Sequence, residues 1–274
     1  MIMNKHAAKR KKKKMNMSTG LRLADFRSDF VFDAFGIDSF FSPTSPMRYW
    51  YKHTRQNASR LPGDIFEFGV YRGASLLAMA ILLKQLGSDK KIYGFDTFAG
   101  FPCYGPEDDL TQFQQLFSTG QISKTHYLKH QLLLRLKQQT GSMEEVTTAN
   151  ISSSGDFSEA SYRELMRRIK LLELDNIELI KGPFRDTVPK FFQESQHKIF
   201  SANIDCDLHE GYSTTLPFIW DNLCSGGYVH LDEYYSLKFP GPRRAVNEFV
   251  RKESAALAKH RTRATEFERW YLTK

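Results

Sequence analysis

Residues 63–75 read GDIFEFGVYRGAS, and residues 91–102 read KIYGFDTFAGFP. The apolar run at 65–70 has the length and composition of a buried parallel strand, and residues 91–95 have those of a second one. Residues 75–86 lie between them and are apolar on most faces, as expected of a buried helix. The stretch from 63 to 102 therefore predicts a strand–helix–strand unit.

The rest of the chain continues this alternation. Further strands are expected at 176–180, 198–204, 227–231 and 269–273. Further helices are expected at 127–139, 158–174 and 243–252. Strands that alternate with helices indicate a doubly wound, mostly parallel α/β sheet with helices on both faces.

The chain length suits one domain of this kind. It has 274 residues, of which 41% are hydrophobic, enough for one sizeable core. We expect a single domain at 21–274. Within it, the aromatic-rich segment 21–62 is expected to form a helical lid over one end. The polar segment 104–150 is expected to be an insertion near the face that binds ligands.

The first 20 residues differ from the rest in charge. Their seven basic residues account for nearly all of the excess positive charge of the chain, and without them the net charge falls from +8 to +1. The run Lys9–Lys14 repels itself, so we expect a disordered basic tail at 1–20. Contact with nucleic acid or a membrane is expected only through this tail, if at all. No apolar signal-peptide segment follows it, and three cysteines without CxxC spacing fit a reducing, cytoplasmic location.

The turn after the first strand has the features of a ligand site. Ligands of open α/β sheets bind beyond the carboxyl ends of the strands. Gly69 and Gly73 bracket the turn and let a ligand approach the backbone, and a helix N-terminus there favours an anionic group. The dinucleotide spacing GxGxxG would need glycine at Tyr71, so the amino-acid end of S-adenosylmethionine (SAM) is favoured over a pyrophosphate. A helix-start turn without a ligand is the alternative.

Two further loops meet the same edge. Asp96 ends the second strand, where an acid can accept hydrogen bonds from ribose hydroxyls, although it could also be a helix cap or turn residue. Gly182 follows the third strand and could border an adenine ring, or belong to an ordinary loop.

Four acids follow the fourth and fifth strands. Asp205 and Asp207 come after one strand, and Asp232 and Glu233 come after the next. Acids at the ends of neighbouring parallel strands would converge on one small volume. Like charges at such short range repel each other unless a cation neutralises them or one is protonated. Oxygen ligands favour a hard ion such as Mg²⁺. Solvated strand-end acids or helix caps are the alternative.

These motifs together resemble the macrocin O-methyltransferase family (TylF/MycF-type) of class I SAM-dependent methyltransferases. The resemblance covers about residues 61–250. The segments that carry it are GDIFEFGVYRGAS (63–75), YGFDTFAGFP (93–102), GDFS (155–158), KGPFRDTVP (181–189), DCDL (205–208), GGYVHLDEY (226–234) and PGPRRAVNEF (240–249).

The resemblance implies a seven-stranded Rossmann-like sheet and a SAM-dependent, Mg²⁺-assisted O-methyltransferase. Its acceptor would be a hydroxyl of a sugar or another small natural-product-like molecule, and the protein would be a homo-oligomer. The implied site residues fall into three groups. The cofactor would be held by Glu67, Gly69, Tyr71, Gly73, Ser75, Asp96, Thr97 and Gly182. The metal would be held by Asp205, Asp232 and Glu233. The general base would be Asp205 or, as second choice, Asp207.

The chain departs from the family pattern on the acceptor side. The family has two aspartates where this chain has Asp232 and Glu233, and Tyr-Glu-Ser-Thr where this chain has HEGY at 209–212. The segment 104–150 is also longer. Two other classes stay open: an NAD(P)-dependent oxidoreductase, disfavoured by the missing GxGxxG, and a non-catalytic protein that binds through its basic tail.

Overall fold

The computed structural model describes residues 29–141 and 145–274, and the predicted tail at 1–20 lies outside them. Within these ranges, seven strands form one sheet in the order β3-β2-β1-β4-β5-β7-β6. The strands are β1 Asp64–Phe68, β2 Ile92–Asp96, β3 Ile177–Lys181, β4 Ile199–Ile204, β5 Leu223–Leu231, β6 Ala256–Lys259 and β7 Trp270–Thr273. Strands β1 to β5 pair in parallel, and β7 runs antiparallel to both neighbours. The predicted sheet is confirmed.

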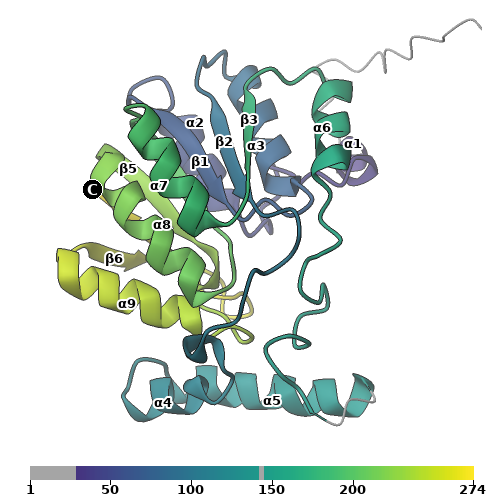
Figure 1. Cartoon of the computed structure of the whole chain (residues 1–274), viewed down its shortest axis with the longest axis vertical. Coiled ribbons are helices and arrows are strands. Elements are labelled where there is room, and N and C mark those ends of the chain that lie inside the picture. The colour runs from purple at the N-terminus through teal and green to yellow at the C-terminus, as the bar shows by residue number, and fades with distance from the viewer. Residues whose placement is uncertain (1–28, 142–144) are drawn as a thin grey trace, which may run out of the picture.

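Helices cover both faces of this sheet (Figure 1). One core contains buried side chains of α2 Arg48–Asn57, α3 Ala74–Gln85 and α6 Tyr162–Leu171, together with those of α1 Asp29–Ala34 and the segment that follows it. The other face carries α7 Phe184–Glu194, α8 His209–Asn222 and α9 Gly241–Glu253. Helix α3 is apolar on all faces, as a buried helix must be, and its eight consecutive residues Leu76 to Leu83 are all buried.

The segment before the first strand is part of the core. In α2, the side chains of Trp50, Tyr51 and Thr54 are fully buried. The Trp50 indole donates a hydrogen bond to Ser201 Oγ of β4 at 3.0 Å, which ties the helix to the middle of the sheet. The described residues of the expected lid, 29–62, thus cover a face of the sheet, and none of them lines the cavity described below.

The segment 104–150 contains η2 Pro106–Asp108, α4 Gln112–Ser118 and α5 Lys124–Gly141. Helices α4 and α5 form a separate layer beyond α9 (Figure 1). Buried His126 and His130 of α5 bond the carbonyls of Ser236 and Leu237 at 2.7 and 2.8 Å. These bonds fasten the segment to the loop after Asp232 and Glu233, the two acids that follow β5. No helix within the described ranges is long and apolar enough to cross a membrane.

Candidate active site

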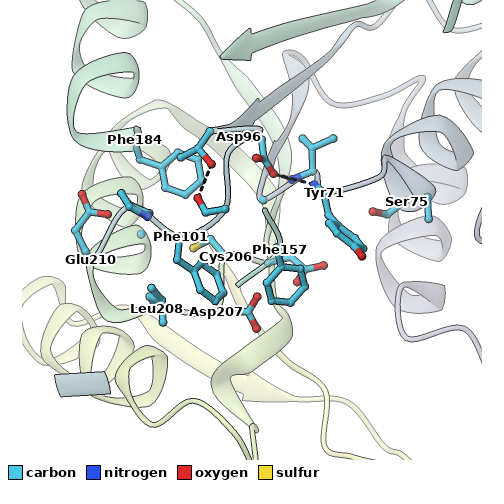
Figure 2. Close-up of a pocket in the computed structure, with 18 residues that line it drawn as sticks. Tyr71, Ser75, Asp96, Phe101, Phe157, Phe184, Cys206, Asp207, Leu208 and Glu210 are labelled. Carbon is cyan, nitrogen blue, oxygen red and sulfur yellow. Dashed lines mark hydrogen bonds between the residues drawn. The ribbon is translucent and has the colours of Figure 1, made fainter. Parts of the chain in front are cut away.

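A cavity of about 260 Å³ lies at the carboxyl ends of β1, β2 and β4. It is lined mainly by the loops that follow these strands and by the start of α8 (Figure 2). The predicted site residues that line it are Gly69, Tyr71, Ser75, Asp96, Thr97, Asp205 and Asp207. Those that do not line it are Glu67, Gly73, Gly182, Asp232 and Glu233.

The glycines of the first turn are explained by backbone geometry. Gly69 has a φ of +93°, and a Cβ there would lie 1.7 Å from the carbonyl oxygen of Asp205. Only glycine therefore lets the β1 and β4 loops touch. Gly73 has a φ of +79° directly before α3. The turn thus places Tyr71 and Ser75 at the cavity wall, beside the N-terminus of α3.

Asp96 joins the loops that follow β1 and β2. Its Oδ2 accepts hydrogen bonds from the backbone N–H groups of Val70 and Tyr71, both at 2.8 Å. Its Oδ1 accepts one from Phe98 N at 2.6 Å. The carboxylate is therefore held by three backbone donors while it still faces the cavity. The neighbouring Thr97 hydroxyl donates to Gly100 O at 2.6 Å.

Glu67 lies behind the cavity wall and has no exposed surface. Its Oε1 accepts hydrogen bonds from Ser75 Oγ at 2.6 Å and from Asn203 Nδ2 at 2.9 Å. Its Oε2 has no hydrogen-bond partner among the described residues. Burial raises the pKa of this carboxyl to about 8. Glu67 thus positions Ser75, one of the residues that line the cavity.

Three acids converge at the other side of the site. Carboxylate oxygens of Asp205, Asp207 and Glu233 all lie within 4.8 Å of one another. Burial, followed by the charge of Asp232, raises the pKa of Asp205 to about 7. Burial and the charge of Asp205 raise the pKa values of Asp207 and Glu233 well above their usual range. Asp207 also has a left-handed φ of +62°, a strained conformation of the kind that occurs at functional sites.

Asp232 has different surroundings. Its Oδ1 lies 3.2 Å from Arg269 Nη1 and 3.7 Å from Nε2 of the buried His230. Burial by itself raises the pKa of Asp232, but His230 and Arg269 outweigh it and hold the pKa at about 2. The predicted metal group contained Asp232, whereas the structure groups Asp207 with Asp205 and Glu233.

This geometry can be compared with known proteins. The family model of macrocin O-methyltransferase (TylF) matches residues 52–129 and 135–260, which is most of the chain. The chain belongs to the macrocin O-methyltransferase family. The family resemblance predicted from the sequence is confirmed.

The chain is similar to curated O-methyltransferases of two Streptomyces species. One is the 8-demethyl-8-(2,3-dimethoxy-alpha-L-rhamnosyl)-tetracenomycin-C 4'-O-methyltransferase of Streptomyces olivaceus, 24% identical over 65% of this chain and 55% of the relative. Another is the demethyldecarbamoylnovobiocin O-methyltransferase of Streptomyces niveus, 26% identical over 71% of this chain and 60% of the relative. The chain thus spans less than two thirds of the length of both.

Two solved structures share the fold. The O-methyltransferase NovP superimposes with a TM-score of 0.56 at 20% identity, over 83% of this chain and 77% of that one. The calicheamicin methyltransferase CalS11 superimposes with a TM-score of 0.55 at 22% identity, over 94% and 82%.

The cavity of this macrocin O-methyltransferase family member is also lined by residues that were not predicted from the sequence. Phe101, Phe157, Phe184 and Glu210 all line the cavity. Phe184 starts α7 directly after the β3 loop, and Glu210 is the second residue of α8, so both follow strands that point at the site. Their positions directly after two predicted strands were the sequence signal that could have identified them. Gly182, which was expected near the adenine, instead packs against Thr187, whose Cγ2 would lie 2.8 Å from an added Cβ.

Proposed function

We propose that this protein is a SAM-dependent O-methyltransferase that acts on a hydroxyl of a sugar or another small natural-product-like molecule. One observation carries the proposal: one cavity is lined both by a glycine turn and Asp96, which suit a nucleoside-type cofactor, and by Asp205 and Asp207 of the acid group. Family membership and curated relatives whose names describe O-methyltransferases support it.

The cofactor's place follows from the chemistry of the loops. The turn from Gly69 to Ser75 offers backbone and a helix N-terminus for the amino-acid carboxylate of SAM. Asp96 has spare acceptor capacity beside its three backbone bonds and would hold the ribose hydroxyls. Glu67 acts through Ser75 and fixes its hydroxyl at the cavity wall.

The acid group fits a magnesium ion. Asp205, Asp207 and Glu233 present oxygen ligands, which a hard divalent cation prefers. Burial, followed by the charges of neighbouring acids, raises their pKa values, and a cation at this point would favour the ionised forms. Such an ion, when bound, lowers the pKa of a hydroxyl next to it. Asp232 stays ionised between Arg269 and His230, so it would contribute negative charge next to this group.

The chain's own acids supply the proton acceptor. Asp205 lines the cavity, where its carboxylate would be placed to take a proton from an acceptor hydroxyl. Asp207 is the second candidate. The methyl group would pass in line from sulfur to the acceptor oxygen, and holding the two reactants in this geometry supplies much of the rate gain.

Calorimetry of the full chain with S-adenosylhomocysteine (SAH) tests the first step. Binding with 1:1 stoichiometry is expected, and absence of binding would reject the methyltransferase proposal. Transfer of labelled methyl from SAM to a panel of glycosides then tests the acceptor class. A thermal-shift panel with NAD and NADP separates the oxidoreductase alternative, because an oxidoreductase would be stabilised by a nicotinamide cofactor and not by SAH.

Further parts of the proposal concern assembly and location. We propose that the protein is a cytoplasmic homo-oligomer, and that it contacts nucleic acid or a membrane only through its tail, if at all. Light scattering tests the oligomeric state. Deletion of residues 1–20 tests the role of the tail: an enzyme keeps its activity, whereas a protein that binds through its tail loses its partner.

A further inference from the structure

Tyr212 lies in the first turn of α8 and has no exposed surface. Its hydroxyl oxygen lies 2.7 Å from Glu233 Oε2 and 2.8 Å from the carbonyl oxygen of Ile204. The same oxygen accepts a hydrogen bond from the backbone N–H of Glu233 at 3.1 Å. One buried hydroxyl therefore contacts both the backbone and the carboxylate of Glu233, the acid that lies close to Asp205 and Asp207.

The hydrogen of this hydroxyl is available to Glu233. A hydroxyl has one hydrogen to donate, and burial raises the pKa of Tyr212 well above its usual range, so the hydrogen stays in place. Two oxygens can accept it: the neutral carbonyl of Ile204 and the carboxylate of Glu233. Because a hydrogen bond to an ionised group is the stronger one, the ionised Glu233 carboxylate receives the hydrogen on Oε2 and keeps its other oxygen free.

The turn of α8 that carries Tyr212 is held in place from two sides. The backbone N–H of His209, the first residue of α8, donates to Oδ1 of the buried Asp108 at 2.8 Å. Gly211 packs closely on the loop after β4, since an added Cβ would lie 2.5 Å from Cys206 Sγ. The ring of Tyr212 belongs to the hydrophobic core on this face of the sheet. The fold therefore fixes the place of the hydroxyl.

We propose that Tyr212 is the positioning residue of the acid group: its hydroxyl holds Glu233 in the orientation in which the three acids can share a divalent cation. The inference rests on the proposed function, because it takes the cation from it. Asp205 and Asp207 follow β4, whereas Glu233 follows β5. Tyr212 is suited to bring them together because it contacts Ile204, the last residue of β4, as well as Glu233.

Tyr212 also has a simpler, structural role to be set against this one. Its contact with Ile204 joins α8 to β4 and would stabilise the fold without any ligand. Both roles predict a less stable protein when the hydroxyl is removed. Only the positioning role predicts that the folded variant binds Mg²⁺ more weakly while its affinity for SAH is unchanged.

Tyr51→Phe is the matched control. Tyr51 is also fully buried, and its hydroxyl donates to a carboxylate, Asp38 Oδ2, at 2.8 Å. It lies in α2 and belongs to the core on the other face of the sheet. The control therefore removes the same kind of hydrogen bond at a distance from the acid group.

The experiment is a calorimetric titration of the full chain with Mg²⁺ and with SAH. Tyr212→Phe should weaken Mg²⁺ binding by roughly tenfold or more, the usual loss when a residue that orients a metal ligand is removed. It should leave SAH binding unchanged, and Tyr51→Phe should leave both affinities unchanged. Excess Mg²⁺ should restore methyl transfer by Tyr212→Phe, because a positioning residue acts through the affinity for the cation.

A double-mutant cycle tests whether Tyr212 acts through the Glu233 carboxylate. Tyr212→Phe should weaken Mg²⁺ binding less in a Glu233→Gln background than in the wild type, and an equal loss in both would contradict the inference. If Tyr212→Phe does not fold, Glu233→Asp takes its place. The shorter side chain keeps the charge but cannot reach both Tyr212 and the other acids, so Mg²⁺ affinity should again fall by about tenfold.

The results that would overturn the inference differ from those that would overturn the proposed function. Wild-type Mg²⁺ affinity in a folded Tyr212→Phe protein, or in Glu233→Asp, would reject the positioning role and leave the proposed function intact. Turnover of Tyr212→Phe that stays low at saturating Mg²⁺ would also reject it, because Tyr212 would then act on the reaction itself. A wild-type protein that binds SAH but no Mg²⁺ would reject the inference together with the proposed metal.

Discussion

Two sets of carboxylates lie at the same edge of the sheet, and they are stabilised in opposite ways. Asp96 accepts three backbone hydrogen bonds and needs no ligand to be satisfied. Carboxylate oxygens of Asp205, Asp207 and Glu233 lie within 4.8 Å of one another, and burial, followed by the charges of neighbouring acids, raises their pKa values. The cofactor side is therefore preorganised by the chain, whereas the acid side is stable only with protons or a cation. Removing a carboxyl should have opposite effects on stability at the two places.

Asp205→Asn should give the largest effect on activity. Loss of the acid at the junction of cavity and acid group should lower kcat by on the order of 10²- to 10⁴-fold, the usual contribution of a positioned base. The melting temperature without metal should rise at pH 8, because one of the repelling charges is gone. Turnover with a glycoside acceptor and thermal unfolding check these two expectations.

The control for this variant is Asp221→Asn, an exposed acid near the other end of α8. It should change neither property. A variant Asp205→Asn that keeps wild-type turnover would remove Asp205 from the mechanism, while a lower melting temperature would show that the acids do not repel each other.

Metal addition and removal tests the acid side directly. Mg²⁺ at about 100 times its dissociation constant should stabilise the protein by roughly 2.7 kcal/mol, because it binds the folded acid group and not the unfolded chain. EDTA should reverse this gain and lower methyl transfer. Glu233→Gln should weaken the Mg²⁺-induced shift in thermal unfolding, while SAH affinity stays near that of the wild type. Equal shifts in wild type and variant would place the ion elsewhere.

Asp96→Asn should lower the stability of the protein, whereas Asp205→Asn should raise it. The amide nitrogen cannot accept, so at least one backbone N–H of the loops loses its partner, at a cost of about 1–3 kcal/mol. Both the melting temperature and the affinity for SAH should fall, the latter by about tenfold or more. Thermal unfolding and calorimetry measure the two. Unchanged stability would mean that the loops are held without this carboxylate.

The fold was more predictable from the sequence than the site. The strands expected at 65–70, 91–95 and 198–204 are mostly apolar, because β1, β2 and β4 are buried along almost their whole length. Strand β6 was missed because Ala256–Lys259 is a four-residue edge strand, and its burial pattern is exposed at both ends. Edge strands of this kind carry little hydrophobic signal.

The site was predicted at the level of loops and less well at the level of atoms. The four acids do follow β4 and β5 as expected. Which of the acids group together depends on Arg269, the residue directly before β7, because it pairs with Asp232. Likewise, the burial of Glu67 behind Ser75 depends on Asn203 of the neighbouring strand. Such contacts depend on tertiary structure, and periodicity and motif spacing do not show them.

Glu67 gives the most specific effect, which is seen as a pH dependence of stability. Its pKa is about 8 in the folded protein and near 4.5 when unfolded, so between these values the folded state holds a proton that the unfolded state has lost. Stability must then fall as pH rises through this window, by at most about 1.4 kcal/mol per pH unit from this group.

The variant Glu67→Gln isolates that contribution, because glutamine keeps the shape and does not titrate. The unfolding free energy of the variant, measured by urea titration from pH 5 to pH 9 without metal, should fall less steeply than that of the wild type. The slope that remains belongs to the acid group, whose raised pKa values act in the same direction, and Mg²⁺ should reduce it. Parallel curves for the two proteins would mean that Glu67 is ionised in the folded state, so that both sides of the site carry buried charge.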